Sequence, residues 1–146
     1  MRVAIGSDHI AVELKTSLIG HLKERYDVVD AGTDSGQRVD YQSVAWNVTQ
    51  LHASGQCDRG ILLCGTGVGM SLAANAAPGI RAVVCSEPYT ARMSRLHNDT
   101  NVLCMGARVI GHELAKMIAD MWLETPFEGG RHKARIDAIM ERRRQG

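Results

Sequence analysis

Cys64 stands directly before three glycines at alternate positions, Gly65, Gly67 and Gly69. Glycine allows backbone N–H groups to approach a ligand without a side chain in the way. The residues that follow indicate a helix, and the N–H groups and dipole at the start of a helix attract negative charge. A thiol in that position is deprotonated more readily than a free thiol. The loop therefore predicts a base beside a site for an anion or a carbonyl oxygen, which suits moving a proton next to a carbonyl.

Two other interpretations of this glycine loop stay open. A dinucleotide-binding loop also joins a strand to a helix, and Glu87 lies roughly 20 residues further on, where the ribose-binding acid of that motif is expected. Against this, Met70 occupies the position of the motif's third glycine, and the motif usually follows the first strand rather than the third. The loop could also be a plain tight turn with Cys64 as an ordinary buried thiol, which is how we interpret the other three cysteines.

Asp8 and His9 lie between a predicted strand and a predicted helix. Asp8 has the alternative role of a helix N-cap, whereas the imidazole of His9 can donate to a phosphate or a hydroxyl group. His97 and Asn98 lie in a segment that leads into a strand, so we expect them at the opposite end of the sheet from Cys64. A turn held by Asx hydrogen bonds is the simpler interpretation of that segment. A site that uses both Cys64 and His97 then needs a short helix or a second subunit.

Arg131 and Arg135 are four residues apart, so they stack on one face of a predicted helix. A solvated charged face is the usual explanation, but two guanidinium groups one turn apart also suit a phosphate dianion. The other side of this helix is apolar and must pack on something. Because the helix follows Gly129 and Gly130, we expect it to reach a neighbouring chain. We interpret the arginines at 142–144 as a solvated tail.

Apolar runs and helical spacing alternate along the whole chain. Strands are expected at residues 3–5, 28–29, 61–63, 80–85 and 101–105. Helices are expected at residues 9–24, 40–51, 70–76, 88–97, 114–122 and 131–143. The alternation predicts one domain over residues 1–146 with a doubly wound, Rossmann-like α/β fold, in which helices cover both faces of a five-stranded parallel sheet. Ligands of such folds bind outside the carboxyl ends of the strands, where Asp8, His9 and Cys64 are expected.

The composition argues against several classes of protein. The formal net charge of +1 and the 23% of charged residues give no electrostatic case for binding nucleic acid or a membrane surface. No apolar run approaches the roughly 20 residues that cross a bilayer, and the first residues indicate a strand rather than a signal peptide. Cys57, Cys64, Cys85 and Cys104 show neither paired nor metal-ligand spacing, which favours reduced thiols in a cytoplasmic protein.

Nearly from end to end, the chain resembles the sugar-phosphate isomerase family that includes type B ribose-5-phosphate isomerases and galactose-6-phosphate isomerase. Each motif is weak by itself, but their combination in this order is highly specific. The motifs that carry the resemblance are Gly6-Ser7-Asp8-His9, Asp40-Tyr41, Cys64-Gly65-Thr66-Gly67-Val68-Gly69, Ala73-Ala74-Asn75, Gly79-Ile80-Arg81-Ala82, His97-Asn98-Asp99, Gly106-Ala107-Arg108-Val109 and Gly130-Arg131-His132.

The resemblance implies an aldose–ketose isomerase that interconverts ribose 5-phosphate and ribulose 5-phosphate through an enediolate, with no metal or organic cofactor. It implies that Cys64 carries the proton between C2 and C1 and that His97 opens the sugar ring. Some members instead use a glutamate at the position of Met70, so Cys64 is the candidate base on this loop. The implied substrate-binding residues are Asp8, His9, Tyr41, Gly65, Thr66, Gly67, Val68, Gly69, Asn98, Arg108, Arg131 and Arg135.

The resemblance also implies a homodimer, or a dimer of dimers, with active sites shared between subunits, which would bring Cys64 and His97 together. Its partners are then a small sugar phosphate and a second copy of the chain, with no nucleic acid and no membrane. One alternative is an isomerase of a hexose 6-phosphate such as allose or galactose, and another is a protein that binds a sugar phosphate without catalysis. The galactose branch divides its catalytic residues between two different chains. This chain carries both, which favours a self-sufficient homo-oligomer.

Overall fold

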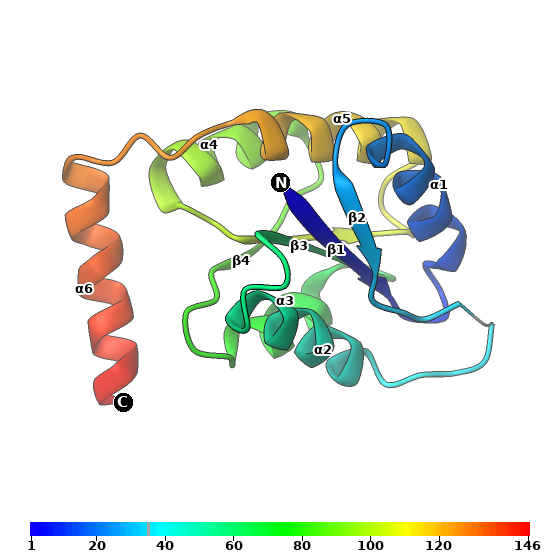
Figure 1. The fold of residues 1–146 in the computed structure, drawn as a ribbon, viewed down its shortest axis with the longest axis horizontal. Coiled ribbons are helices and arrows are strands. Elements are labelled where there is room, and N and C mark those ends of the chain that lie inside the picture. Colours follow the sequence, from blue (N-terminus) through cyan, green and yellow to red (C-terminus); the bar gives the residue numbers. More distant parts are fainter. Residues whose placement is uncertain (35) are drawn as a thin grey trace.

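The computed structural model describes residues 1–34 and 36–146, with a parallel β-sheet at its centre (Figure 1). Five strands form this sheet in the order β2-β1-β3-β5-β4. The predicted α/β fold with five parallel strands is confirmed, although the sequence does not predict the order of the strands. The strands are β1 (Arg2–Ser7), β2 (Asp27–Asp30), β3 (Arg59–Cys64), β4 (Ala82–Val84) and β5 (Val102–Gly106).

Helices cover both faces of the sheet (Figure 1). One face is covered by α1, α4 and α5, the other by α2 and α3, and α6 lies apart from both layers and contacts α4. Within the described residues, no helix combines the length and apolar character needed to cross a membrane. The helices are α1 (Val12–Leu22), α2 (Tyr41–Ala53), α3 (Val68–Asn75), α4 (Pro88–Asn98), α5 (His112–Glu124) and α6 (Arg131–Gln145).

The central strand β3 is buried on both faces, which explains its continuous apolar run. Ile61 and Leu63 face the core beneath α1 and α5, whereas Leu62 and Cys64 face the core beneath α2 and α3. Each fully buried aliphatic side chain of this kind contributes roughly 1.5–3 kcal/mol. This alternation fixes the side of the sheet toward which the Cys64 thiol points.

The neighbouring strands β1 and β3 continue into helices on opposite faces of the sheet, because α1 follows β1 and α3 follows β3. The chain therefore diverges at the carboxyl ends of these two strands. Folds of this kind bind their ligands at such a switch point. Asp8 and His9 follow β1 there, and the glycine loop of residues 64–69 follows β3.

The C-terminal helix α6 is fixed to its own chain near both ends. His132 and Ile136 are buried near its start. Near its end, the Arg143 guanidinium donates to carbonyl groups at the end of α3 and in the following turn, including that of Ile80 at 2.7 Å. The interpretation of residues 142–144 as a solvated tail is therefore wrong for Arg143. That α6 reaches a partner subunit stays a prediction.

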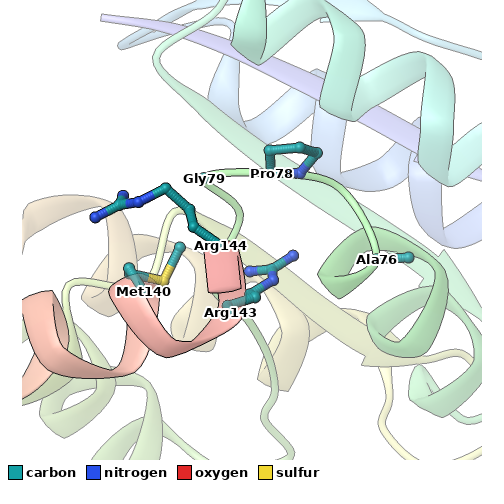
Figure 2. Close-up of a pocket in the computed structure, with 6 residues that line it drawn as sticks. All are labelled: Ala76, Pro78, Gly79, Met140, Arg143 and Arg144. Carbon is teal, nitrogen blue, oxygen red and sulfur yellow. The ribbon is translucent and has the colours of Figure 1, made fainter. Parts of the chain in front are cut away.

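A hollow of about 620 Å³ lies between the end of α6 and the turn after α3. It is at the opposite end of α3 from Cys64 and lies outside the candidate site described below. Figure 2 shows the residues that line it: Ala76, Pro78, Gly79, Met140, Arg143 and Arg144.

Candidate active site

Cys64 is the last residue of β3, and its thiol points into the glycine loop. The backbone N–H of Gly67 donates to Cys64 Sγ at 3.1 Å. Gly67 is the N-cap of α3, so this N–H belongs to the group of donors that a helix start leaves without a partner inside the helix. Such donors bond most strongly to a charged acceptor. A nearly buried sulfur with a backbone donor aimed at it is the arrangement expected of a thiol used as a base.

Two glycines allow the loop to lie directly against β5. Gly67 has a φ of +84°, and a Cβ at this position would lie 3.1 Å from the backbone of Met105. A Cβ on Gly106 would lie 2.7 Å from the backbone of Thr66. Backbone N–H groups of the segment after β5 also donate to the carbonyls of Cys64 and Gly65, at 2.8 and 3.1 Å. The loop is therefore held rigidly, with its N–H groups fixed in direction.

Tyr41 and Arg108 lie beside the glycine loop. The ring of Tyr41 lies against Gly69, where a Cβ would approach Cζ of the ring to 2.9 Å. The side chain of Arg108 passes Gly65, where a Cβ would lie 3.7 Å from Cδ. A phenol from the start of α2 and an exposed guanidinium from the segment after β5 thus flank the backbone donors.

Asp8 and His9 are fixed by the backbone around them. Asp8 Oδ1 accepts from the N–H of Ile10 at 3.0 Å, an Asx turn that delays the start of α1 to Val12. Asp8 is therefore not the N-cap of α1, and the helix begins three residues later than predicted. His9 Nδ1 accepts from the N–H of Val39 at 3.3 Å, which leaves Nε2 of the neutral ring as the donor.

Together these residues form what we term the thiol half-site, which faces the carboxyl ends of β1, β3 and β5. Around the start of α3 it brings together the Asp8 carboxylate as an acceptor and the His9 and Arg108 side chains as donors. The Tyr41 phenol and the Cys64 thiol complete the group. The thiol half-site consists of Asp8, His9, Tyr41, Arg108 and residues 64–69.

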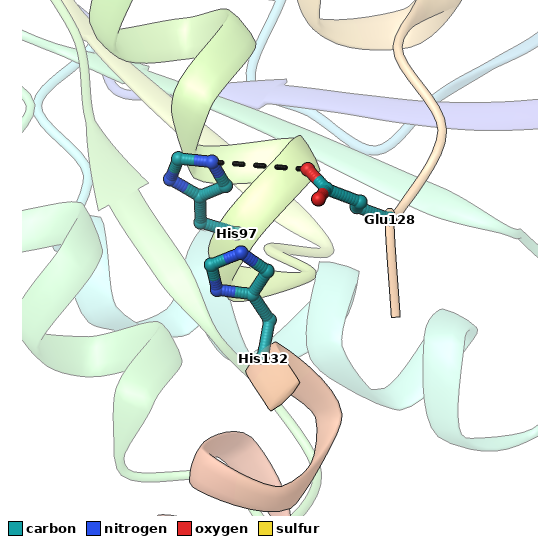
Figure 3. Close-up of side chains that lie close together, drawn as sticks. All are labelled: His97, Glu128 and His132. Carbon is teal, nitrogen blue, oxygen red and sulfur yellow. Dashed lines mark ion pairs between the residues drawn. The ribbon is translucent and has the colours of Figure 1, made fainter. Parts of the chain in front are cut away.

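A second cluster, the imidazole half-site, lies where α4 ends and α6 begins. The rings of His97 and His132 stack with centroids 4.3 Å apart and planes at 13° (Figure 3). Glu128 Oε2 lies 3.9 Å from His97 Nε2, and the N–H of Glu128 donates to the carbonyl of Leu96 at 3.0 Å. The imidazole half-site consists of His97, Asn98, Glu128, Arg131, His132 and Arg135.

The two histidines have different surroundings. His97 keeps 41% of its side chain exposed. His132 is only 6% exposed, and its Nε2 has no hydrogen-bond partner among the described residues. Burial lowers the pKa of His132, and the nearby charges of His97 and Arg131 lower it further. Arg131 and Arg135 themselves are exposed on α6, one turn apart.

The two half-sites lie at opposite ends of the sheet. In the pairing of β3 with β5, Gly60 lies opposite Val102 and Cys64 lies opposite Gly106. These two pairs are separated by roughly 13 Å, at about 3.3 Å per residue of strand. His97 precedes the start of β5, so within one chain it lies farther still from Cys64. The structure therefore bears out the expectation that one chain does not bring these two residues together.

The other cysteines behave as ordinary buried thiols. Burial raises the pKa of Cys57 and Cys104, and it raises the pKa of Cys85 to about 12. Glu87, which a dinucleotide site would use, caps α4 instead: both its carboxylate oxygens accept from the N–H of Thr90 at 3.0 Å. Hydrogen bonds from the side chain and the backbone of Thr90 lower the pKa of Glu87.

Sequence reasoning missed the grouping of Glu128 and His132 with His97. From the sequence, His132 is named only as part of the motif Gly130-Arg131-His132, and Glu128 is not named at all. The contact depends on how the segment after α5 returns to the end of α4, which no local pattern encodes. Asp40 is the N-cap of α2, but its carboxylate makes no capping hydrogen bond.

Comparison with known proteins gives a consistent result. The family model described as Ribose/Galactose Isomerase matches residues 3–139. Ribose-5-phosphate isomerase B of Escherichia coli is 56% identical over 146 residues, which cover 98% of each chain. Two solved ribose-5-phosphate isomerases B are also similar: that of Clostridium thermocellum (TM-score 0.97, 49% identity, 99% of each chain) and that of Thermotoga maritima (TM-score 0.93, 50% identity, 96% of this chain and 97% of that one). The prediction of an aldose–ketose isomerase is thereby confirmed at the level of the family, and the chain belongs to the ribose/galactose isomerase family.

Proposed function

We propose that this protein interconverts ribose 5-phosphate and ribulose 5-phosphate through an enediolate. The observation that carries the proposal is the Gly67 N–H aimed at Cys64 Sγ in a loop of backbone donors. The 56% identity to a relative named ribose-5-phosphate isomerase B supports the choice of substrate. Backbone donors at the start of a helix suit the negative charge that develops on an enediolate oxygen.

The proposed proton transfer from C2 to C1 uses Cys64, the candidate base on the glycine loop. The thiolate removes the proton from C2 of the open-chain aldose, and the C1 carbonyl oxygen takes up the negative charge. The thiol then returns the proton to C1, while the C2 hydroxyl passes its proton to the O1 oxyanion, so that C2 becomes the ketone and C1 the hydroxymethyl group. Thr66 Oγ1 accepts from the N–H of Val68 at 3.3 Å, which leaves its hydroxyl hydrogen free to donate to a sugar oxygen.

The proposed ring opening uses His97 of the partner subunit, because His97 of the same chain is too far from Cys64. Its imidazole transfers a proton at the ring oxygen or the anomeric hydroxyl of the closed sugar. Asn98 of the partner subunit, next to His97, would bind sugar hydroxyls. Asp8, His9 and Tyr41 of the thiol half-site would bind sugar hydroxyls as well. Each of these groups offers a donor or an acceptor.

Three arginines are proposed to bind the phosphate and the substrate. Arg131 and Arg135 are exposed one turn apart, so both guanidinium groups can reach one dianion. Arg108 lies beside the glycine loop in the other half-site. A phosphate held between Arg108 of one chain and the pair from its partner would place the sugar between Cys64 and His97.

The proposal requires a homodimer in which a second copy covers the thiol half-site. Apolar side chains around the loop support this, since Val68, Leu72 and Val109 are all more than half exposed. Leu72, at 68%, lies one turn after Val68 on the same face of α3. An exposed apolar surface beside a polar site is typical of an interface.

A hexose-6-phosphate isomerase would use the same chemistry with a longer pocket, and no feature of the described residues favours it. A protein that only binds sugar phosphate would not need a thiol beside backbone donors. Comparing kcat/KM for ribose 5-phosphate and allose 6-phosphate separates the first alternative, with a higher value for the pentose expected. A higher value for the hexose would contradict the proposed substrate.

Replacing the base separates catalysis from binding. Cys64→Ala should lower kcat by roughly 10²–10⁴, the contribution typical of a positioned proton-transfer group, with measurable substrate affinity. Cys57→Ala is the control, because Cys57 is a buried thiol outside the glycine loop. A normal kcat in Cys64→Ala would remove Cys64 as the base.

A further inference from the structure

Three side chains that commonly bind metal ions converge in the imidazole half-site. His97 comes from α4, Glu128 from the segment before α6, and His132 from α6 itself (Figure 3). One ligand atom from each, two imidazole nitrogens and a carboxylate oxygen, all lie within 4.8 Å of one another. His97 is distant in sequence from Glu128 and His132, so the fold itself completes the cluster.

An independent observation also points to a ligand here. Nε2 of His132 is buried and has no hydrogen-bond partner among the described residues. Buried polar atoms without a partner are uncommon in folded proteins, and each calls for an explanation such as an ion. This nitrogen belongs to a side chain that stacks on His97, the second imidazole of the cluster.

We propose that His97, Glu128 and His132 bind a divalent transition-metal cation of the zinc class, and that the bound cation inhibits isomerisation by occupying His97. Two imidazoles and one carboxylate form a ligand set that Zn²⁺ accepts, with a fourth tetrahedral position left for water. Nickel, cobalt and copper ions accept imidazole as well, whereas Mg²⁺ and Ca²⁺ prefer oxygen ligands.

Binding requires a limited movement of the exposed members of the cluster. The lone pair of an imidazole nitrogen lies in the ring plane, so two nearly parallel rings do not point at one ion. His97 and Glu128, at 41% and 53% exposed, have room to turn, whereas His132 is fixed by burial. Closing the ligand atoms to about 3.4 Å apart fits tetrahedral coordination at about 2.0–2.2 Å from the ion.

The charges around the cluster have opposing effects on the binding of a cation. Arg131 and Arg135 place positive charge near His132, which opposes a cation. The Glu128 carboxylate supplies the opposite charge as a ligand. Removal of Glu128 should therefore weaken binding by more than the loss of a neutral ligand would, because the arginine charges are then opposed less.

The inhibitory effect rests on the proposed role of His97, whereas binding of the cation does not. An imidazole nitrogen bonded to an ion has no lone pair for the proton of the sugar ring. Bound Zn²⁺ should therefore slow the turnover of closed-ring ribose 5-phosphate.

The first experiment measures binding in the full-length enzyme without substrate. Zn²⁺ titrations by calorimetry should give one site per chain, and Co²⁺ should give a visible absorption band. Glu128→Gln and His132→Asn should each weaken Zn²⁺ binding by at least the roughly 10–100-fold that loss of a partner of a metal ligand costs. His21→Asn is the control, since His21 pairs only with Asp120 on the surface and should leave binding unchanged.

A Cys64→Ala background removes the other strong zinc ligand of the active site. Zn²⁺ binding should persist there, and its loss would place the ion at the thiol and overturn the proposal. Unchanged binding in both Glu128→Gln and His132→Asn, with the folded state confirmed by circular dichroism, would also overturn it. Half-inhibition of the wild-type enzyme should occur at the Zn²⁺ concentration that half-fills the site. Binding without inhibition would overturn the inhibitory part and leave the isomerase proposal intact.

Discussion

Cys64 and His97 lie at opposite ends of the paired strands β3 and β5: Cys64 ends β3, and His97 precedes the start of β5. Because the sheet is parallel, the end of one strand is never next to the start of its neighbour. Along these strands, the residue pairs Gly60–Val102 and Cys64–Gly106 are separated by roughly 13 Å, and His97 lies beyond the Val102 end. A reaction that needs both residues therefore needs two chains, and we propose that each chain contributes one half of each site.

Removing His97 should separate ring opening from proton transfer. Ribulose 5-phosphate has no free C5 hydroxyl with which to close a furanose ring, so its enolisation needs only Cys64. His97→Asn should lower conversion of ribose 5-phosphate by roughly 10²–10⁴, while C1 hydrogen exchange of ribulose 5-phosphate with D₂O persists. Cys64→Ala should lose both activities in the same NMR assay. Equal losses of exchange and conversion in His97→Asn would show that His97 does not act on the ring.

The arginines of α6 should affect substrate binding more than chemistry. Arg131→Gln and Arg135→Gln should each raise KM by about 10–150-fold, which corresponds to a charged hydrogen bond of about 1.5–3 kcal/mol. Arg142→Gln is a control on an exposed position of the same helix. Steady-state kinetics with an unchanged KM in both variants would show that these arginines only solvate the surface.

Gly67 is required for both its φ and its closeness to β5. Gly67→Ala should lower stability by about 1–2 kcal/mol for the left-handed backbone, and by a further 1–3 kcal/mol for crowding. Gly55→Ala is a matched control, because Gly55 has a φ of +76° but open space around it. Urea unfolding should show the larger loss in Gly67→Ala, together with a loss of activity. Equal losses in the two variants would refute the close packing of the loop.

The Glu87 cap should make α4 sensitive to acid. Its pKa is lowered in the folded state, so its stabilising effect is present above the unfolded value of about 4.3 and is lost as pH falls through the folded value. Thermal unfolding should show a lower Tm for Glu87→Gln than for wild type at pH 7. The two Tm values should converge below about pH 4. Glu24→Gln, an exposed carboxylate change elsewhere, should give no such convergence, and a difference that persists in acid would contradict the cap.

Much of the fold follows from the sequence. Buried strands such as Ile61–Leu63 are continuous apolar runs, and α5 shows clear helical spacing, so both are recognised locally. Predicted helix boundaries are wrong where a side chain competes with the helix for backbone N–H groups. At Asp8 this gives an Asx turn, and α1 starts later than predicted. The strand order, with β5 between β3 and β4, depends on long-range packing that no local pattern encodes.

The candidate site, like the fold, is predictable from the sequence only in part. The thiol half-site is predictable because Cys64 and its glycines are neighbours in sequence and the switch point is a property of the fold. In the imidazole half-site, the motifs indicate His97, Asn98, Arg131 and Arg135. Their grouping with Glu128 and His132 is not predictable, since His132 meets His97 only through the return of the chain after α5. Arg143 illustrates the same limit, because its role depends on carbonyl groups more than sixty residues away. The cytoplasmic location and the homodimer stay predictions.

The proposed active site combines Cys64 of one chain with His97 of another. Purified Cys64→Ala and His97→Asn proteins, each nearly inactive on ribose 5-phosphate, should regain activity when mixed under conditions of proven subunit exchange. In an equal mixture of symmetric dimers half of the molecules are mixed and each has one intact site, so about a quarter of wild-type activity is expected. No recovery of activity despite demonstrated exchange would contradict the shared site.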